Sequence, residues 1–312
     1  MKTAKLATSL AAWLTLGSIC HAQDAEQDPA EYLRELADSG YVSEYGRDAK
    51  WHLDDHRKLS ASISALAPQR AGVVDAYVIA VGLDSDAVFG SEASEAARVL
   101  SRRYDAAGRT ILLAAGTGAG GDTAPNGSPQ NLAVAISAVA ATMDPKEDVL
   151  VLFSTSHGSA ESGLAYRDAD YANGMIGPNR LKDLLDGSGI ERRMIIISAC
   201  YSGIFVPALQ TDNTVVITAA SSKTTSFGCA ADNDWTFFGD ALLNNTLRTS
   251  DPLKVATRKA FGLISAWEKR ERISASRPQL FIGKETSAWL EPLEARMPKG
   301  TTARVGRPAR LR

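Results

Sequence analysis

The chain has 312 residues, of which 45% are hydrophobic and 22% charged, and this balance excludes the disordered and fibrous classes of protein. Its formal net charge of −2 at pH 7 gives no indication of a nucleic-acid partner. The length allows one large domain or two small ones, and a core of roughly 200 residues buries enough apolar surface to fold without disulfides.

The first residues predict a secretory signal peptide over 1–22. Lys2 and Lys5 precede an apolar run over 6–19 that is too short to span a bilayer, and we expect cleavage after Ala22. The mature chain is then exported, periplasmic or secreted, and has no membrane contact. It keeps two cysteines, Cys200 and Cys229, which are too few for a disulfide-built scaffold.

Residues 23–70 predict an N-terminal helical accessory segment, with polar helices near 29–38 and 50–66. An inhibitory pro-segment and a structural flank both fit this composition. His52 and His56 have the spacing of two metal ligands on a helix, but Leu53 stands where the metalloprotease motif requires Glu. We therefore expect a solvated helix face and no metal.

Residues 71–285 alternate between strand and helix patterns. Helices are expected at 129–143, 178–186 and 252–268, and nearly continuous apolar runs predict strands at 73–81, 109–115, 149–155, 193–199, 214–220 and 279–282. Such runs are typical of a parallel sheet with helices on both faces. The predicted fold class is α/β, a three-layer α/β/α sandwich with a mainly parallel, about six-stranded sheet. Residues 286–312 form a C-terminal segment whose basic tail is expected to be a solvated, flexible end.

Polar side chains follow two of these strands directly. His157 follows the run at 149–155, and Cys200 follows the run at 193–199. Ligands of parallel sheets bind at the carboxyl ends of the strands, and neighbouring strands lie about 5 Å apart. This placement predicts a thiol nucleophile beside an acid–base partner. The backbone N–H groups of Gly158 and Cys200 are candidates for an oxyanion hole.

These motifs resemble a known family. A strand that ends in Ser156-His157-Gly158, followed by one that ends in Ala199-Cys200-Tyr201-Ser202-Gly203, is similar to the legumain-type cysteine peptidases, relatives of caspases, gingipains and the lipid-anchor transamidase catalytic subunit. The resemblance covers roughly 73–285 and includes segments 226–229 and 278–283. It implies a caspase-like sandwich, Cys200 as nucleophile with His157 as partner, a protein or peptide substrate, and no cofactor.

Members of that family often use an asparagine after the first strand to orient the histidine, and Asp84 is the candidate here. The loop after the fifth strand supplies Ser221, Ser222 and Asp232 as candidates for the substrate pocket. An acidic pocket favours Arg or Lys before the scissile bond and a mixed one favours Asn, and both stay open. Cys229 in the same loop is either a packed thiol or a redox partner of Cys200.

The expected function is that of a cysteine endopeptidase working through an acyl-enzyme. A transpeptidase or ligase using the same intermediate and a catalytically inactive peptide-binding domain remain alternatives. Trp235 and Phe238 are expected in the core, and the glycine-rich stretch 116–121 is expected to form a loop because no helix follows it directly. The oligomeric state stays open.

Overall fold

The computed structural model of the protein describes residues 28–116 and 123–311. The expected signal peptide and residues 117–121 of the glycine-rich loop lie outside the described residues. Within the described ranges, no helix combines the length and the apolar character needed to span a bilayer.

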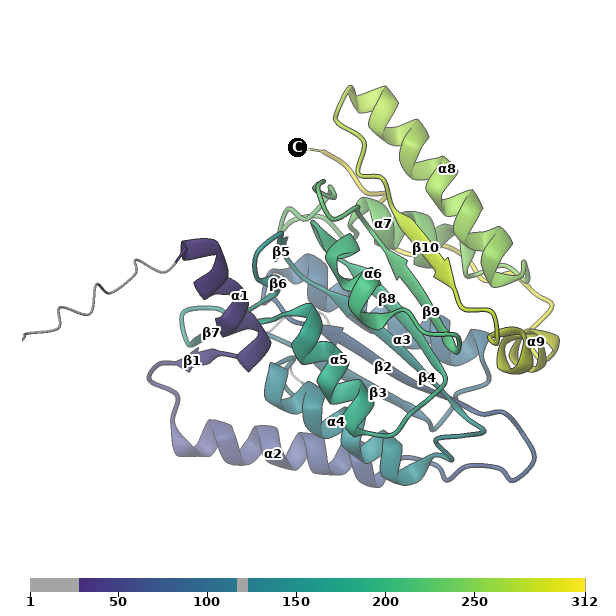
Figure 1. Cartoon of the computed structure of the whole chain (residues 1–312), viewed down its shortest axis with the longest axis horizontal. Coiled ribbons are helices and arrows are strands. Elements are labelled where there is room, and N and C mark those ends of the chain that lie inside the picture. Colours follow the sequence, from purple (N-terminus) through teal and green to yellow (C-terminus); the bar gives the residue numbers. More distant parts are fainter. Residues whose placement is uncertain (1–27, 117–122, 312) are drawn as a thin grey trace, which may run out of the picture.

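A six-stranded sheet forms the centre of the molecule, in the order β10-β9-β8-β4-β2-β3 (Figure 1). Its strands are β2 (Ala76–Gly82), β3 (Thr110–Ala114), β4 (Val149–Thr155), β8 (Arg193–Ser198), β9 (Thr214–Thr218) and β10 (Gln279–Ile282). Only β10 among them pairs antiparallel, with β9. The predicted mainly parallel sheet is therefore confirmed.

Helices cover both faces of this sheet (Figure 1). One face carries α2 (Ala49–Ser64), α4 (Pro129–Thr142), α5 (Pro178–Gly187) and α6 (Val206–Leu209), and the other carries α3 (Ala87–Arg103), the π-helix η2 (Asp240–Thr246), α8 (Leu253–Glu271) and α9 (Ser287–Ala295). Each face of the sheet has its own hydrophobic core. Successive side chains of β2 alternate between these two cores, since Val78 packs on one side and Tyr77 and Ile79 pack on the other. The three-layer sandwich is confirmed, and Trp235 and Phe238 are buried as expected.

Helix α3 differs from the expected pattern, which assigns no helix between the first two strands. Its buried face mixes a few large apolar residues with small ones such as Ala93, Ala96 and Ala97, and it includes the charged residues Glu92 and Arg103. The usual apolar stripe of a core-facing helix is therefore hidden. This helix and its N-cap residue, Asp86, place Asp86, Phe89 and Glu92 near the carboxyl edge of the sheet.

A second sheet of four strands, in the order β1-β7-β6-β5 and called the small sheet below, is likewise absent from the predicted pattern. It contains β1 (Val42–Glu44), β5 (Gly158–Ser159), β6 (Gly163–Asp168) and β7 (Ala172–Ile176). Strand β1 comes from the N-terminal segment, after α1 (Pro29–Ser39), and pairs antiparallel with β7. Leu59 of α2 packs in the core under the main sheet.

The C-terminal segment makes defined contacts, in contrast to the expected solvated end. The Trp235 indole donates to the Val305 carbonyl (2.9 Å), and the Ala309 N–H donates to the carboxylate of Asp240 (2.9 Å). Arg307 pairs with Asp234 (2.9 Å) and thereby holds the pKa of that carboxyl below its usual range. Contacts with the buried residues Trp235 and Asp240 therefore hold the C-terminal segment against the domain, although most of its side chains are exposed.

Candidate active site

His157 and Cys200 leave the carboxyl edge of the sheet from neighbouring parallel strands. Thr155 of β4 pairs with Ser198 of β8, and each candidate residue lies two positions beyond its strand's paired residue. The segments that follow the two strands, here called the strand exits, are in contact, because a Cβ atom at Gly158 would lie 2.4 Å from the Cys200 carbonyl oxygen. The structure thus brings the predicted pair to one place, and only glycine fits at 158.

A sharp turn presents Cys200. Tyr201, the next residue, has a φ of 56°, in the left-handed region that costs an L-residue about 1–2 kcal/mol. Its N–H donates to the Thr224 carbonyl (2.9 Å), which anchors the turn to the loop after β9. Strained residues of this kind persist only where the surroundings fix them, and they cluster at functional sites.

Ser226 holds the Cys200 thiol. The Ser226 N–H donates to Sγ (3.3 Å), and Sγ lies 3.5 Å from the Ser226 carbonyl oxygen and 3.6 Å from its hydroxyl. Ser226 was not among the predicted site residues. The signal for it in the sequence is its place in the 226–229 segment shared with the legumain-type peptidases.

Gly158 keeps a backbone donor available beside Cys200. Strand β5 pairs antiparallel with β6, with Gly158 opposite Leu164, and the next N–H on β6, that of Ala165, donates to the His157 carbonyl (3.0 Å). In an antiparallel ladder this makes Gly158 and Leu164 a non-hydrogen-bonded pair, so the Gly158 N–H points away from β6. Its direction suits the predicted oxyanion hole.

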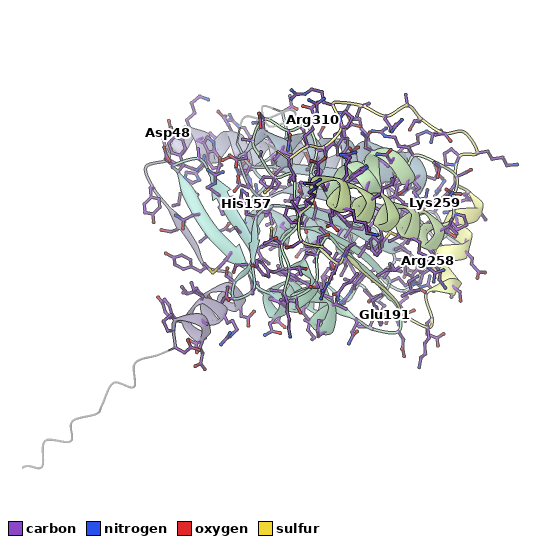
Figure 2. The ribbon with its side chains drawn as sticks, turned by 90° about the horizontal axis from the view of Figure 1, so that it is seen from above. Asp48, His157, Glu191, Arg258, Lys259 and Arg310 are labelled. Atoms are coloured by element: carbon purple, nitrogen blue, oxygen red, sulfur yellow. The ribbon has the colours of Figure 1, made fainter. Side chains whose placement is uncertain are left out.

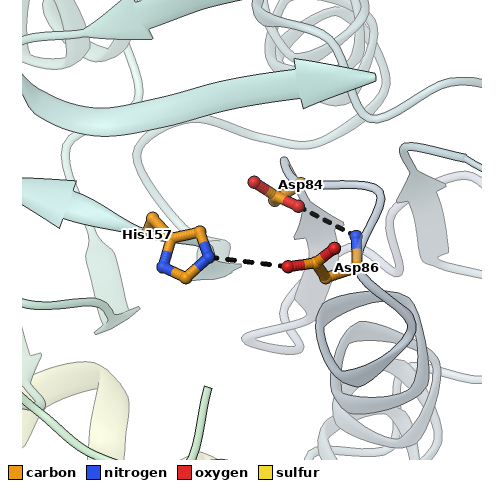
Figure 3. Close-up of side chains that lie close together, drawn as sticks. All are labelled: Asp84, Asp86 and His157. Carbon is orange, nitrogen blue, oxygen red and sulfur yellow. Dashed lines mark hydrogen bonds and ion pairs between the residues drawn. The ribbon is translucent and has the colours of Figure 1, made fainter. Parts of the chain in front are cut away.

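The carboxylate that faces His157 is Asp86, not the predicted Asp84. His157 Nε2 lies 3.7 Å from Asp86 Oδ2, and Nδ1 points away from the carboxylates (Figure 3). Phe89 meets the imidazole edge-on, with the ring centroids 5.0 Å apart. Asp84 is buried and binds Arg167 through two hydrogen bonds (2.8 and 3.0 Å). His157 itself is 42% exposed, and Figure 2 shows it between the small sheet and α8.

Asp84, Asp86 and His157 have ligand atoms within 4.8 Å of one another, a spacing suited to a metal ion. However, the Arg167 guanidinium lies 2.8 Å from Asp84 and 2.7 Å from Asp86, and these two carboxyls raise its pKa above the usual range. A fixed cation already pairs with both carboxylates, leaves one net negative charge, and would repel a metal ion bound beside it. The residues present do not favour a metal here.

Replacing Asp86 by Asn is expected to lower kcat about fivefold with little change in KM. The carboxylate faces the His157 imidazole at 3.7 Å, and a partly exposed ion pair contributes on the order of 1 kcal/mol, which is about fivefold in rate. Steady-state kinetics on a peptide substrate check this. Asp54→Asn, at an exposed ion pair of α2, is the matched control and leaves both constants unchanged. An Asp86→Asn enzyme as fast as the native one contradicts the assignment.

Two of the predicted pocket residues, Ser221 and Ser222, lie near Cys200, and the third, Asp232, contacts the C-terminal segment. The Ser221 hydroxyl is engaged with that of Thr224 (2.7 Å) in a turn whose Thr224 carbonyl accepts from Tyr201, so Ser221 and Ser222 lie beside the nucleophile's turn. Asp232 is exposed, and its carbonyl accepts from Arg307 (2.7 Å). The substrate pocket stays a prediction.

Cys200 and Cys229 are both free thiols in the structure. Burial raises the pKa of the Cys229 thiol, and the neighbouring Cys200 raises it further. Cys229 is thus close enough to Cys200 to feel its charge, and its raised pKa makes the Cys229 thiol poorly suited to act as a nucleophile.

The fold and this sheet edge define the class, an α/β sandwich with a thiol and an imidazole at the carboxyl ends of adjacent strands. Residues 129–281 match the model of the Peptidase C13 family, the legumain family. This segment, which contains β4, β8 and the motifs that end them, is therefore of that family, and the resemblance found in the sequence is confirmed.

Comparison with curated proteins finds no match. The solved structures similar to this fold include caspase-1 from Spodoptera frugiperda, at 11% sequence identity and a TM-score of 0.45. That match covers 69% of this chain and 92% of the caspase chain.

Proposed function

We propose that the protein is a cysteine endopeptidase. Cys200 Sγ attacks the carbonyl carbon of a peptide bond, and the Gly158 and Cys200 N–H groups bind the oxyanion. His157 passes a proton to the leaving amine, which departs as the acyl-enzyme forms. Water, deprotonated by His157, then adds to the thioester and releases the acid. The observation that carries this proposal is the contact between the two strand exits, within the segment that matches the peptidase family.

The test is digestion of a proteome-derived peptide library by residues 23–312 with reductant present. Mass spectrometry then reads the cleavage sites, and Cys200→Ala serves as control. Cleavage by the native protein alone supports the proposal, and it reveals whether the pocket prefers Arg, Lys or Asn. Added amine nucleophiles that appear in the products indicate transpeptidation. Peptide binding without turnover by either protein favours the inactive-domain alternative.

We propose that residues 28–66 are a structural flank and not an inhibitory pro-segment. Strand β1 completes the small sheet, and Arg47 next to it is a buried ion-pair partner of Asp168 on β6. Export also remains a proposal, since residues 1–22 lie outside the described structure. A protein recovered from the periplasm or medium that does not begin at Gln23 contradicts the proposed cleavage.

A disulfide between Cys200 and Cys229 is the predicted redox latch. With oxidised glutathione, both thiols lose their hydrogens, glutathione is reduced to two thiols, and one Cys200–Cys229 bond forms. The native enzyme is expected to lose activity and regain it with reductant. Peptide mapping should find the linked peptide, which Cys229→Ser cannot form. Full activity and no linked peptide after this treatment contradict the latch.

A further inference from the structure

Glu92 is a fully buried carboxyl directly beneath the candidate site. It lies on α3 with no exposed surface. The Thr155 hydroxyl donates to its Oε1 (2.9 Å), and the Thr236 N–H donates to its Oε2 (2.9 Å). Thr155 ends β4, two residues before His157, and Thr236 caps α7 (Phe237–Gly239) after the loop that carries Ser226 and Cys229.

The structure gives the Glu92 carboxyl no charged partner among the residues it describes. Every partner of the Glu92 carboxyl within the described residues is neutral, and burial raises its pKa. An unpaired buried carboxyl is costly, so its presence calls for a role besides packing. The surroundings also fit it closely, because a Cβ atom at Gly239 would lie 2.1 Å from Glu92 Oε2.

The hydrogen-bond partners of Glu92 lie on the strands that precede His157 and Cys200 and on the helix that follows the Ser226 loop. Ser198, two residues before Cys200, is hydrogen-bonded to the Glu92 carboxyl and has its hydroxyl 3.2 Å from that of Thr236. Glu92 thus links the end of β4, the end of β8 and the start of α7. The same helix carries Phe89 and begins after Asp86, its N-cap residue, and both side chains face the His157 ring.

We propose that Glu92 is a positioning residue, whose buried carboxyl fixes the ends of β4 and β8 so that His157 and Cys200 keep their mutual geometry. This inference rests on the proposed peptidase function. It does not make Glu92 a catalytic residue, since Glu92 acts through Thr155, Ser198 and Thr236 and does not reach the substrate.

The test compares Glu92→Gln with Glu95→Gln, the same chemical change one turn further along α3. Glutamine at 92 keeps an acceptor for Thr155 and presents an NH₂ group to the Thr236 N–H. We expect kcat to fall about tenfold with KM within about twofold, since small displacements of reacting groups carry large rate penalties. Glu95 pairs with Arg248 (2.8 Å) away from the site, so Glu95→Gln keeps the native kcat.

A second readout does not depend on turnover. Alkylation of Cys200 by iodoacetamide, followed at that residue by peptide mapping, is expected to slow severalfold in Glu92→Gln and not in Glu95→Gln. Thr155→Val removes one hydrogen bond to Glu92 at nearly constant shape, and it serves if Glu92→Gln does not fold. Its expected effects are the same in direction.

Native kcat and native alkylation in the folded Glu92→Gln or Thr155→Val protein, with lowered thermal stability alone, overturn the proposal and leave the peptidase function standing. A native protein that cleaves nothing contradicts the peptidase function. In that case the alkylation rates of Cys200 still decide whether Glu92 positions the thiol.

Discussion

Alanine at Cys200 or at His157 is expected to lower peptidase kcat by about 10³-fold or more, and the double variant is expected to be no slower than Cys200→Ala alone. The two side chains leave adjacent strands whose exits touch at Gly158, so they act as one unit in the transfer of a proton and the attack on the carbonyl. Once the nucleophile is absent, removing its acid–base partner is not expected to lower the rate further.

Single-turnover kinetics on one fluorogenic peptide, chosen from the library cleavage sites, measure these three variants. Cys229→Ala and His56→Ala are the matched controls, a second thiol and a second imidazole, and both should keep native rates in reductant. Losses at Cys200 and His157 that multiply in the double variant show independent roles. Such a result excludes the proposed dyad, as does a Cys200→Ala protein with native activity.

The strands and the position of the site were open to prediction because their signals are local. Each strand of the main sheet is a continuous apolar run, and a parallel sheet brings the residues that follow β4 and β8 to one edge. His157 and Cys200 are therefore visible in the sequence.

The supporting residues were not visible, because their partners lie far away in the chain. Asp84 and Asp86 follow the same strand, and their roles depend on residues of other elements, since Arg167 binds both carboxylates and Asp86 also faces His157. Glutamate usually lies on the exposed face of a helix, so the burial of Glu92 becomes apparent only when α3 is seen packed against β4. The roles of these supporting residues depend on tertiary contacts, which the local periodicity of the sequence does not reveal.

Arg47→Ala is expected to lower the free energy of unfolding by about 3–5 kcal/mol, which corresponds to a fall in Tm of about 10 °C in a domain of this size. The Arg47 side chain is 4% exposed and the Asp168 side chain 6%. The Arg47 guanidinium also stacks on Trp51, 3.6 Å from the ring centroid. Removing it leaves the Asp168 carboxylate buried with the neutral Asn126 amide as its side-chain partner.

Arg57→Ala on α2 is the matched control, because its ion pair with Asp54 is exposed and contributes less than about 1 kcal/mol. Arg47→Met combined with Asp168→Asn should recover most of the stability, since neither charge is then buried alone. Thermal unfolding followed by circular dichroism measures all three proteins. If Arg47→Ala unfolds at the same temperature as Arg57→Ala, the N-terminal segment is not a structural part of the domain. The pro-segment alternative then takes its place, and a chain that begins after residue 66 should be folded and more active than the longer one.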